Sequence, residues 1–268
     1  MEEGQVSDTS TNQSVEKAAL VLAAFSSGTP LRVADVARAV DLGQSTTSRM
    51  LATLETTGFV ERDELGLYHL GPTLITLAGA AVNAHPVHRV SRQPAQQLAA
   101  SLGLGANVAV RRGDVLFYLC NFEGRRAPRA FTLMGQTNPL HATGLGKALL
   151  SGLSPVRRRE LLPELQRFTE RTITDHEALD EAIVQIAVQG VTGEVEELAL
   201  GRGCLAAPIL DRHGTVAAAI SVSGPLSALD LAHRQKELSD ALIETADAIS
   251  SALGYHGPTA VSRQGVGA

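Results

Sequence analysis

The spacing of apolar residues predicts helices at the start of the chain and short strands after them. From Ser14, apolar side chains recur at helical intervals as far as Phe25, with Ser14 as the expected N-cap and a stop at 28–30. A second short helix follows over 33–40, and it ends in a turn at 41–43, where a glycine can take a positive φ. The inward residues expected of the first helix are Val15, Ala18, Ala19, Leu22 and Phe25.

A third helix begins directly after this turn, and its two sides differ in chemistry. The predicted inward stripe is Thr47, Met50, Leu51 and Leu54. The opposite side carries Ser45, Arg49, Ala52 and Thr56. The N-terminal turn of this helix therefore presents small polar groups and one arginine.

After Gly58 the apolar period shortens to two, which predicts a hairpin with strands near 59–62 and 67–70. The order helix, helix, glycine turn, helix, hairpin is typical of a winged helix-turn-helix, whose second motif helix enters the DNA major groove. We assign this domain to 14–72 and expect 1–13 to be a disordered tail.

The rest of the chain predicts a helical linker and then a larger domain. Residues 73–88 form the expected linker helix, 89–254 the second domain, and 255–268 a disordered tail. Strands are expected at 107–111, 115–120, 130–132, 204–210 and 215–222, and helices at 90–102, 144–151 and 176–189, with a final helix that carries Leu231 to Ile249. Helices around a largely antiparallel sheet make this an α+β domain.

Composition narrows the function classes. The chain has 268 residues, 44% of them hydrophobic and 19% charged, which suits two globular domains. No stretch approaches the roughly 18 apolar residues of a membrane span, and the polar, acidic N-terminus differs from a secretory signal. Two cysteines favour a reducing compartment and disfavour a disulfide framework or a four-cysteine zinc site. We expect a cytoplasmic protein without membrane contact, metal or cofactor.

Charge counts against DNA binding. The formal net charge is −5, and the first 75 residues hold five basic groups against ten acidic ones. Because neutralised phosphates supply most nonspecific affinity, this affinity should be weak. Binding would then depend on dimerisation and on contacts with bases.

Five segments together resemble a known family. They are SVEKAALVLAAFSSG, VADVARAVDLGQSTTSRMLATLETTGFVERD, PLHATGLGKALL, GCLAAPILDRHG and VAAAISVSGP. In this order, over residues 14 to about 254, they resemble the isocitrate-lyase-regulator (IclR) family of bacterial transcription factors. The resemblance implies a dimer, or a dimer of dimers, whose GAF-like C-terminal domain binds a small metabolite, often a carboxylate or an aromatic acid.

Carried over by motif, the family's effector pocket falls on Gly144, Leu145, Cys204, Ser221 and Ser223. The residues agree with this placement, because two serines two positions apart on a strand face the same side. Amides at the start of a helix suit an anion, and we expect them to be exposed at 144–146.

At a position where the family often has Asp, this chain has Glu194, which also belongs to the implied pocket. The side chain is longer by one methylene, which predicts a tighter or differently angled pocket. We therefore transfer neither the glyoxylate-type specificity of the family nor any other individual ligand.

Other interpretations compete at several residues. The expected DNA contacts could instead only cap or solvate the helix; they are Gln44, Ser45, Thr46, Thr47, Ser48 and Arg49, with Arg62 in the wing. The GLGK segment does not match a P-loop, because Ala148 follows its lysine. Cys204 could line the pocket, fill space in the core, or act as a catalytic thiol with His141 as base. We expect His85 and His88 to be solvated linker residues.

We therefore predict a sequence-specific transcriptional regulator, repressor or activator, whose binding to a double-stranded DNA operator responds to a small-molecule effector. A homodimer would bind a palindromic site. The alternatives are a small-molecule enzyme that uses Cys204 in a sensor-type domain, and a constitutive DNA-bound scaffold with a vestigial pocket.

Overall fold

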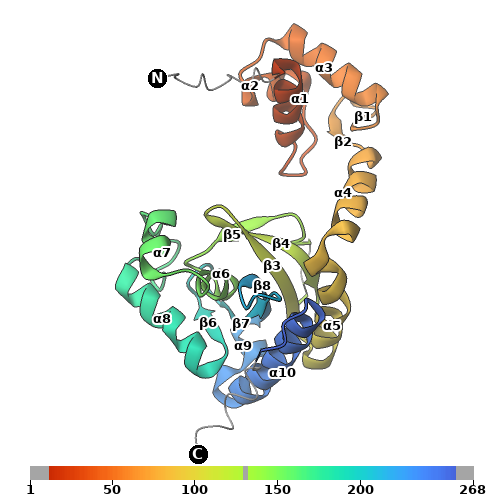
Figure 1. Ribbon diagram of the computed structural model, residues 1–268. Helices are drawn as coiled ribbons and strands as arrows, with labels where there is room; N and C mark the ends of the chain where they lie inside the picture. Colours follow the sequence, from red (N-terminus) through yellow and green to blue (C-terminus); the bar gives the residue numbers. More distant parts are fainter. Residues whose placement is uncertain (1–11, 129–131, 258–268) are drawn as a thin grey trace, which may run out of the picture. The chain divides into compact units, whose positions relative to one another are not determined.

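The computed structural model describes residues 12–128 and 132–257. The chain divides into two compact units, Met1–Ala81 and Val82–Ala268. The division falls within helix α4 (Pro72–Ala84), part of the segment expected to be a linker (Figure 1). Each unit has its own hydrophobic core, and each is described separately.

The first unit has the predicted order of elements. It contains α1 (Gln13–Ala23), α2 (Val33–Ala39), α3 (Gln44–Thr56), β1 (Val60–Arg62) and β2 (Tyr68–Leu70). The two strands form an antiparallel hairpin, and Leu31 extends it through a bridge to Tyr68. The Asp63 carboxylate accepts the amides of Leu65 and Leu67 at 2.9 and 2.8 Å, which closes the turn. The predicted winged helix-turn-helix is confirmed.

Three local predictions in this unit were wrong. The N-cap of α1 is Asn12, whose side chain accepts the amide of Ser14, because the helix begins one residue before Ser14. Val15 is 66% exposed, whereas Val21, outside the predicted stripe, is fully buried. In the 41–43 turn it is Asp41 that takes the positive φ of 51°, and Gly43 has a φ of −62° as N-cap of α3. Asp tolerates this left-handed region better than most residues with a side chain.

In the second unit, an antiparallel six-stranded sheet separates two cores. The strand order is β5-β4-β3-β8-β7-β6. The strands are β3 (Gly105–Arg112), β4 (Val115–Phe122), β5 (Thr137–Pro139), β6 (Thr192–Val195), β7 (Arg202–Leu210) and β8 (Val216–Pro225). The prediction of an α+β domain with an antiparallel sheet is confirmed.

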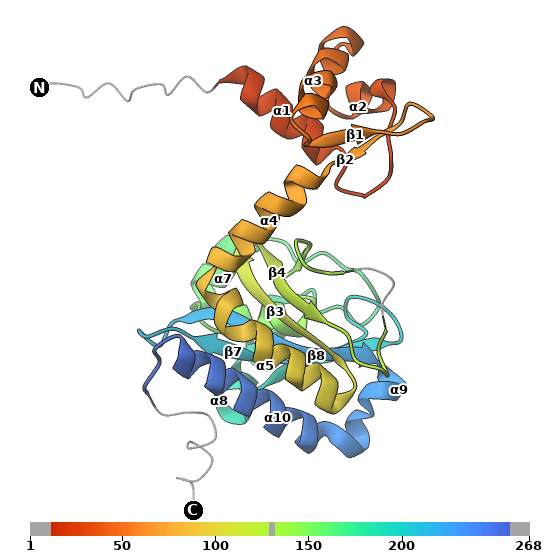
Figure 2. The ribbon, with the colours of Figure 1, turned by 90° about the vertical axis from the view of Figure 1, so that its right-hand side faces the viewer.

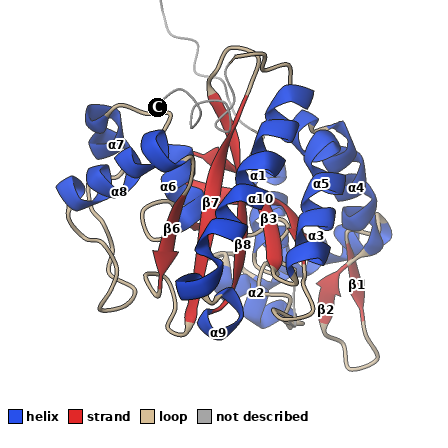
Figure 3. Cartoon of the chain, turned by 90° about the horizontal axis from the view of Figure 1, so that it is seen from below, coloured by secondary structure: helices blue, strands red, loops and turns tan. Residues whose placement is uncertain are grey.

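Helices cover both faces of this sheet. Side by side on one face lie α5 (Pro86–Leu102) and α10 (Leu231–Ala252), shown in Figure 2. The other face packs against α6 (Gly144–Leu150) and α8 (His176–Gln189), next to α7 (Pro155–Leu161), as Figure 3 shows. The short α9 (Leu226–Leu229) follows β8 directly.

Some sequence-derived boundaries moved in this unit. Helix α5 begins at Pro86 rather than near Val90, since proline suits the first turn of a helix. The strand expected at 130–132 falls mainly on residues outside the described ranges, and Thr132 is not in a strand. The predicted tails 1–13 and 255–268 also lie mostly outside these ranges, and the part at Gln13 belongs to α1.

Helix α6 lies so close to its neighbours that its glycines have no room for a side chain. A Cβ on Gly146 would sit 2.0 Å from the Leu140 carbonyl oxygen, and one on Gly144 would sit 2.8 Å from the Cys204 sulfur. All residues of α6 are buried. Close backbone approach therefore sets the position of this helix against the sheet.

The Gly146→Ala substitution should lower the free energy of unfolding by more than about 3 kcal/mol, because the clash is with backbone atoms that cannot rotate away. Urea denaturation of the full chain measures this. Gly79→Ala is the matched control, since its Cβ would meet nothing within 4 Å on α4 and alanine favours a helix. Equal stability of the Gly146→Ala variant and wild type would contradict the proposed close packing.

Candidate functional site

A small cavity of about 130 Å³ opens at the N-terminal end of α6, between this helix and the sheet. Its walls come from β3, β4, β7 and β8 and from the segment around Glu194. Five of the six residues expected in the pocket line it: Leu145, Glu194, Cys204, Ser221 and Ser223. The sixth, Gly144, lies directly behind the Cys204 sulfur.

An asparagine amide organises the two serine hydroxyls. Asn107 Nδ2 donates to Ser223 Oγ at 3.1 Å and to Ser221 Oγ at 3.4 Å. The Asn107 carbonyl oxygen in turn accepts from Asn121 Nδ2 at 2.8 Å. Ser221 and Ser223 thus face the same side of β8, while Ile220 belongs to the core on the other face, as expected. Sequence reasoning missed Asn107, although an asparagine within the apolar run of β3 was a usable signal.

The other polar groups of the pocket were also not expected from the sequence. Asn138 Nδ2 donates to Tyr118 Oη at 3.0 Å, and both residues line the cavity. Arg202, at the start of β7, also lines the cavity, and it lies on the same side of the strand as Cys204 two residues later. Among the described residues, Arg202 takes part in none of the ion pairs found. It is the cation of the pocket, placed there because β7 begins two residues before Cys204.

The expectation of exposed amides at 144–146 was wrong. These residues are buried, and the Gly146 amide donates to Thr143 Oγ1 at 3.0 Å, which is the N-cap interaction of α6. The Gly144 amide hydrogen-bonds to the Cys204 sulfur. The helix start is thus capped internally by the protein and does not offer these two amides to an anion.

Cys204 and His141 do not form a nucleophile–base pair. Burial and then the Glu194 charge raise the pKa of the Cys204 thiol well above its usual range. His141 lies outside the residues that line the cavity, and its Nε2 is 2.8 Å from the Gln166 carbonyl oxygen. Burial also lowers the pKa of His141. An activated cysteine needs a lowered pKa, whereas the pKa of Cys204 is raised and His141 is not placed as its base.

Glu194 faces Cys204 across the β6–β7 pair, and the pKa of its carboxyl group is raised above the usual range. Burial raises the pKa of Glu194, while the Glu197 amide, which donates to Glu194 Oε2 at 2.9 Å, acts in the opposite direction. The lining of the pocket therefore combines one arginine with hydroxyls, amides and a carboxyl group of raised pKa.

A buried ion pair fixes α6 to the segment after β6. Lys147 is 1% exposed, and its ammonium group is paired with the Glu197 carboxylate. Lys147 Nζ also donates to the Gly193 carbonyl oxygen at 3.3 Å. The lysine of the GLGK segment is thus a structural cation held within the protein, and it does not extend into a phosphate-binding loop.

The polar side of α3 is accessible, with one exception. Gln44, Ser45, Ser48 and Arg49 are exposed and Thr46 is half-buried. Thr47 is fully buried, and its hydroxyl donates to the Gly43 carbonyl oxygen at 3.2 Å, so the expectation that its side chain contacts DNA was wrong. Arg62 is exposed on the wing, with its guanidinium carbon 5.6 Å from the centroid of the Tyr68 ring.

The prediction that His85 and His88 are solvated was also wrong. His88 is 9% exposed and His85 is half-buried, and burial lowers the pKa of both. Within residues 12–128 and 132–257, no group of three or more His, Cys, Asp or Glu side chains is placed to hold a metal ion. In the same residues, no helix combines the length and apolar character needed to cross a bilayer.

Comparison with known proteins agrees with both units. Residues 14–64 match the IclR helix-turn-helix domain, and residues 79–251 match the bacterial transcriptional regulator IclR C-terminal domain. The chain belongs to the IclR family of bacterial transcriptional regulators. This confirms the resemblance seen in the sequence.

Named relatives of this IclR-family protein are regulators. The chain is 38% identical over 234 residues to the HTH-type transcriptional regulator BhcR of Paracoccus denitrificans, covering 86% of this chain and 83% of that protein. It is 36% identical over 242 residues to the transcriptional repressor AllR of Salmonella typhimurium, covering 87% of each. The fold resembles an IclR homologue from Microbacterium hydrocarbonoxydans crystallised with 4-hydroxybenzoate, with a TM-score of 0.79, 24% identity, and coverage of 90% and 98%.

The Lys147→Met substitution should lower the free energy of unfolding by about 3–5 kcal/mol, because it leaves the Glu197 carboxylate buried without its cation. Adding Glu197→Gln should recover most of this loss, as measured by urea denaturation of the single and double variants. Lys236→Met, which removes the exposed pair with Asp240, is the control and should change stability little. The same loss for Lys147→Met and Lys236→Met would show that the buried pair has no special role.

Proposed function

We propose that this IclR-family protein binds an operator through α3 and the wing, and that a small carboxylate in the 130 Å³ cavity controls this binding. The main support for a carboxylate effector is that Arg202 lines the cavity. The other polar lining groups are hydroxyls, amides and the Glu194 carboxyl group, whose pKa is raised. Guanidinium groups bind carboxylates with two parallel hydrogen bonds. The anchor of the effector is then Arg202, with Ser221, Ser223 and Asn107 as further partners.

The volume of the cavity limits the size of the acids that can bind in it. Its volume of about 130 Å³ corresponds to roughly four water molecules at ~30 Å³ each. Drug-sized ligands occupy pockets of about 300–1,000 Å³. An acid of a few carbons fits the cavity as it stands, whereas an aromatic acid requires Tyr118 or Leu145 to move. The 4-hydroxybenzoate of the Microbacterium structure is therefore not transferred to this chain.

The exposure of polar side chains and of one arginine on α3 supports the DNA-binding part of the proposal. We assign base or phosphate contacts to Arg49 and to the exposed polar side chains Gln44, Ser45 and Ser48, with Thr46 at their edge. Arg62 is assigned to a phosphate beside the wing. A homodimer with two such reading heads would bind a palindromic operator, with half-sites spaced by the symmetry of the protein.

In this proposal the two DNA-binding domains of the dimer have two arrangements, and effector binding shifts the equilibrium between them. A ligand shifts such an equilibrium only by the difference in its affinity for the two arrangements. Neither unit carries a catalytic constellation at the sites described above, so we propose a regulator without enzymatic activity. The constitutive scaffold is the remaining alternative, and ligand-induced stabilisation separates it from a sensor.

The Arg49→Ala variant should lose specific operator binding at least tenfold, because a cation on the exposed side of α3 is removed. Footprinting of the DNA that flanks its own gene, against excess nonspecific competitor, gives the measurement. Lys236→Ala removes an exposed cation from α10 and serves as the charge-matched control. A wild-type protein that protects every duplex equally at matched salt would refute the specific-regulator proposal.

Small acids such as acetate, pyruvate and succinate should raise the melting temperature of wild type, and 4-hydroxybenzoate should raise it less, because of the cavity volume. The acid with the largest effect should bind Arg202→Gln at least tenfold more weakly by calorimetry, since the guanidinium is lost. Arg212→Gln, at the exposed β7–β8 turn, controls for charge. Unchanged affinity in Arg202→Gln, or no stabilisation by any acid, would count against this effector class.

A further inference from the structure

A groove in the first unit runs between α1 and α3, which pack against each other (Figure 2). Its volume is about 430 Å³, and all of its described lining residues belong to these two helices. They are Ser14, Lys17 and Ala18 of α1, and Thr46, Arg49, Met50, Thr53 and Leu54 of α3. The groove therefore places a second helix beside residues of α3 that we assign to DNA contact.

Helix periodicity explains why Lys17 lies at this groove. Lys17 precedes the fully buried Val21 by four residues, so both lie on the same face of α1. Val21 belongs to the core of the first unit together with Leu51 and Leu54 of α3. Lys17 is half-buried at the margin of this core. A lysine in such a position covers apolar surface with its methylene stem and keeps its ammonium group in water.

The charge of the groove is positive and uncompensated. Lys17 and Arg49 both line it, and none of its described lining residues is acidic. Within residues 12–128 and 132–257, neither Lys17 nor Arg49 takes part in an ion pair. Ser14 and Thr46 add hydroxyl groups, which can also donate to an anion. Two of the five basic residues among the first 75 thus line a single groove, on helices that are separated in the sequence.

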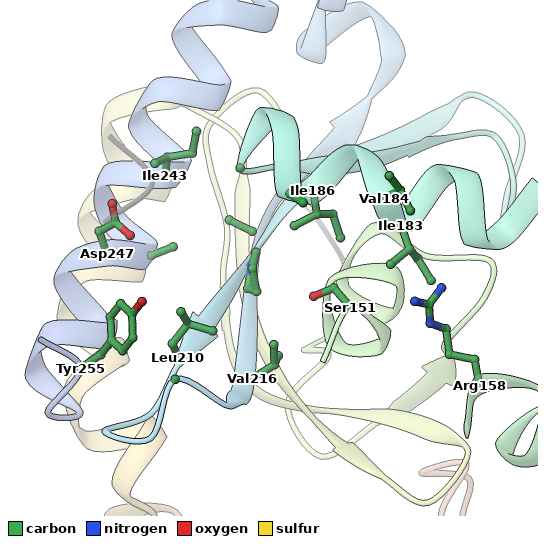
Figure 4. Close-up of a pocket in the computed structure, with 16 residues that line it drawn as sticks. Ser151, Arg158, Ile183, Val184, Ile186, Leu210, Val216, Ile243, Asp247 and Tyr255 are labelled. Carbon is green, nitrogen blue, oxygen red and sulfur yellow. The ribbon is translucent and has the colours of Figure 1, made fainter. Parts of the chain in front are cut away.

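The charged residues at a larger cavity in the second unit lack this property. That cavity has a volume of about 400 Å³, and Arg158 and Asp247 are among the residues that line it (Figure 4). Arg158 is paired with Asp180, and Asp247 also has an interaction partner within the protein. Its charged groups are already satisfied internally, whereas those of the groove between α1 and α3 are available to an external anion.

The position of the groove indicates which anion it would meet. Thr46 and Arg49 belong both to the groove and to the residues of α3 that we assign to DNA contact. A duplex held by α3 therefore brings its sugar-phosphate backbone toward α1. Lysine binds phosphate as a point charge and needs no single geometry to do so. Contacts of this kind fix the register and orientation of a protein on DNA but do not distinguish one base from another.

We propose that the groove between α1 and α3 holds one phosphate of the operator backbone, with Lys17 as the contact from α1 and Thr46 and Arg49 beside it on α3. This inference rests on the proposed operator binding, and it adds a positioning contact from outside the helix-turn-helix. Lys17 then determines how firmly α3 is held on the duplex, whereas the choice of sequence stays with α3.

Fluorescence anisotropy of the full chain on two labelled duplexes tests the proposal: the operator found by footprinting, and a random sequence of equal length. Lys17→Met should weaken binding to both duplexes by a similar factor, about fivefold at ~0.1 M salt, because one phosphate loses its cation. The slope of log affinity against log salt should fall by about 0.9 on both. Lys17→Arg keeps the charge and should bind like wild type. Lys236→Met is the control, since it removes an exposed lysine from α10 and should change neither the affinity nor the slope.

The outcomes separate this inference from the proposed function. If wild type binds the operator and Lys17→Met keeps its affinity and salt slope, the phosphate contact is overturned and the regulator proposal stands. A loss on the operator alone, or an equal loss in Lys17→Arg, would also overturn it, because a phosphate contact depends on charge and not on sequence. If wild type binds both duplexes equally, the proposed function fails, while the salt slope on the random duplex still decides the role of Lys17. A wild type that binds neither duplex at low salt would overturn both proposals.

Discussion

Removing a lysine ammonium group from water costs several kcal/mol unless an anion and hydrogen-bond acceptors replace the lost hydration. In this protein the Glu197 carboxylate and the Gly193 carbonyl oxygen replace the lost hydration of the Lys147 ammonium group. The pair joins α6, whose N-terminal end lies at the small cavity, to the segment that follows β6.

The elements with strong periodicity could be predicted from the sequence. The inward stripe of α3, the wing and the long strands β7 and β8 each follow from apolar spacing and turn residues. The buried face of helix α1 could not be predicted in the same way, because the consecutive apolar residues at 18–22 fit more than one helical stripe. In the structure Val21 is buried and Val15 is exposed. Short elements such as β6 and α9 were missed, since three or four residues carry no measurable period.

The pocket was predictable in part for a similar reason. Ser221, Ser223 and Cys204, which the motif positions assign to the pocket, all line the small cavity, and the two serines share a face because they are two positions apart on one strand. Asn107, Tyr118 and Arg202 come from other strands, and only the register of the sheet brings them to the same cavity. The amides at 144–146 were misjudged because Thr143 caps the helix. The sequence shows a possible cap there but cannot show that the cap excludes an external anion.

Helix α6 and strand β7 extend from the small cavity toward a second cavity of about 400 Å³. Leu145 at one end of α6 lines the small cavity, and Ser151, the residue after the other end, lines the second one. On β7, Cys204 lines the small cavity and Ala207, three residues later, lines the second one. Both elements are buried and close-packed, so a displacement at one end cannot be absorbed locally. Any binding energy that couples the two cavities through these elements must act equally in both directions.

The scarcity of cations in the first 75 residues determines how strongly DNA binding by this unit depends on salt. Each phosphate neutralised by a protein releases counterions, and the affinity falls with salt at a slope set by the number of such contacts. A DNA-binding unit with five basic residues can release few counterions, so its operator occupancy should change little with salt concentration. The same property shortens its residence on random DNA, so that it samples the chromosome more by collision from solution than by sliding.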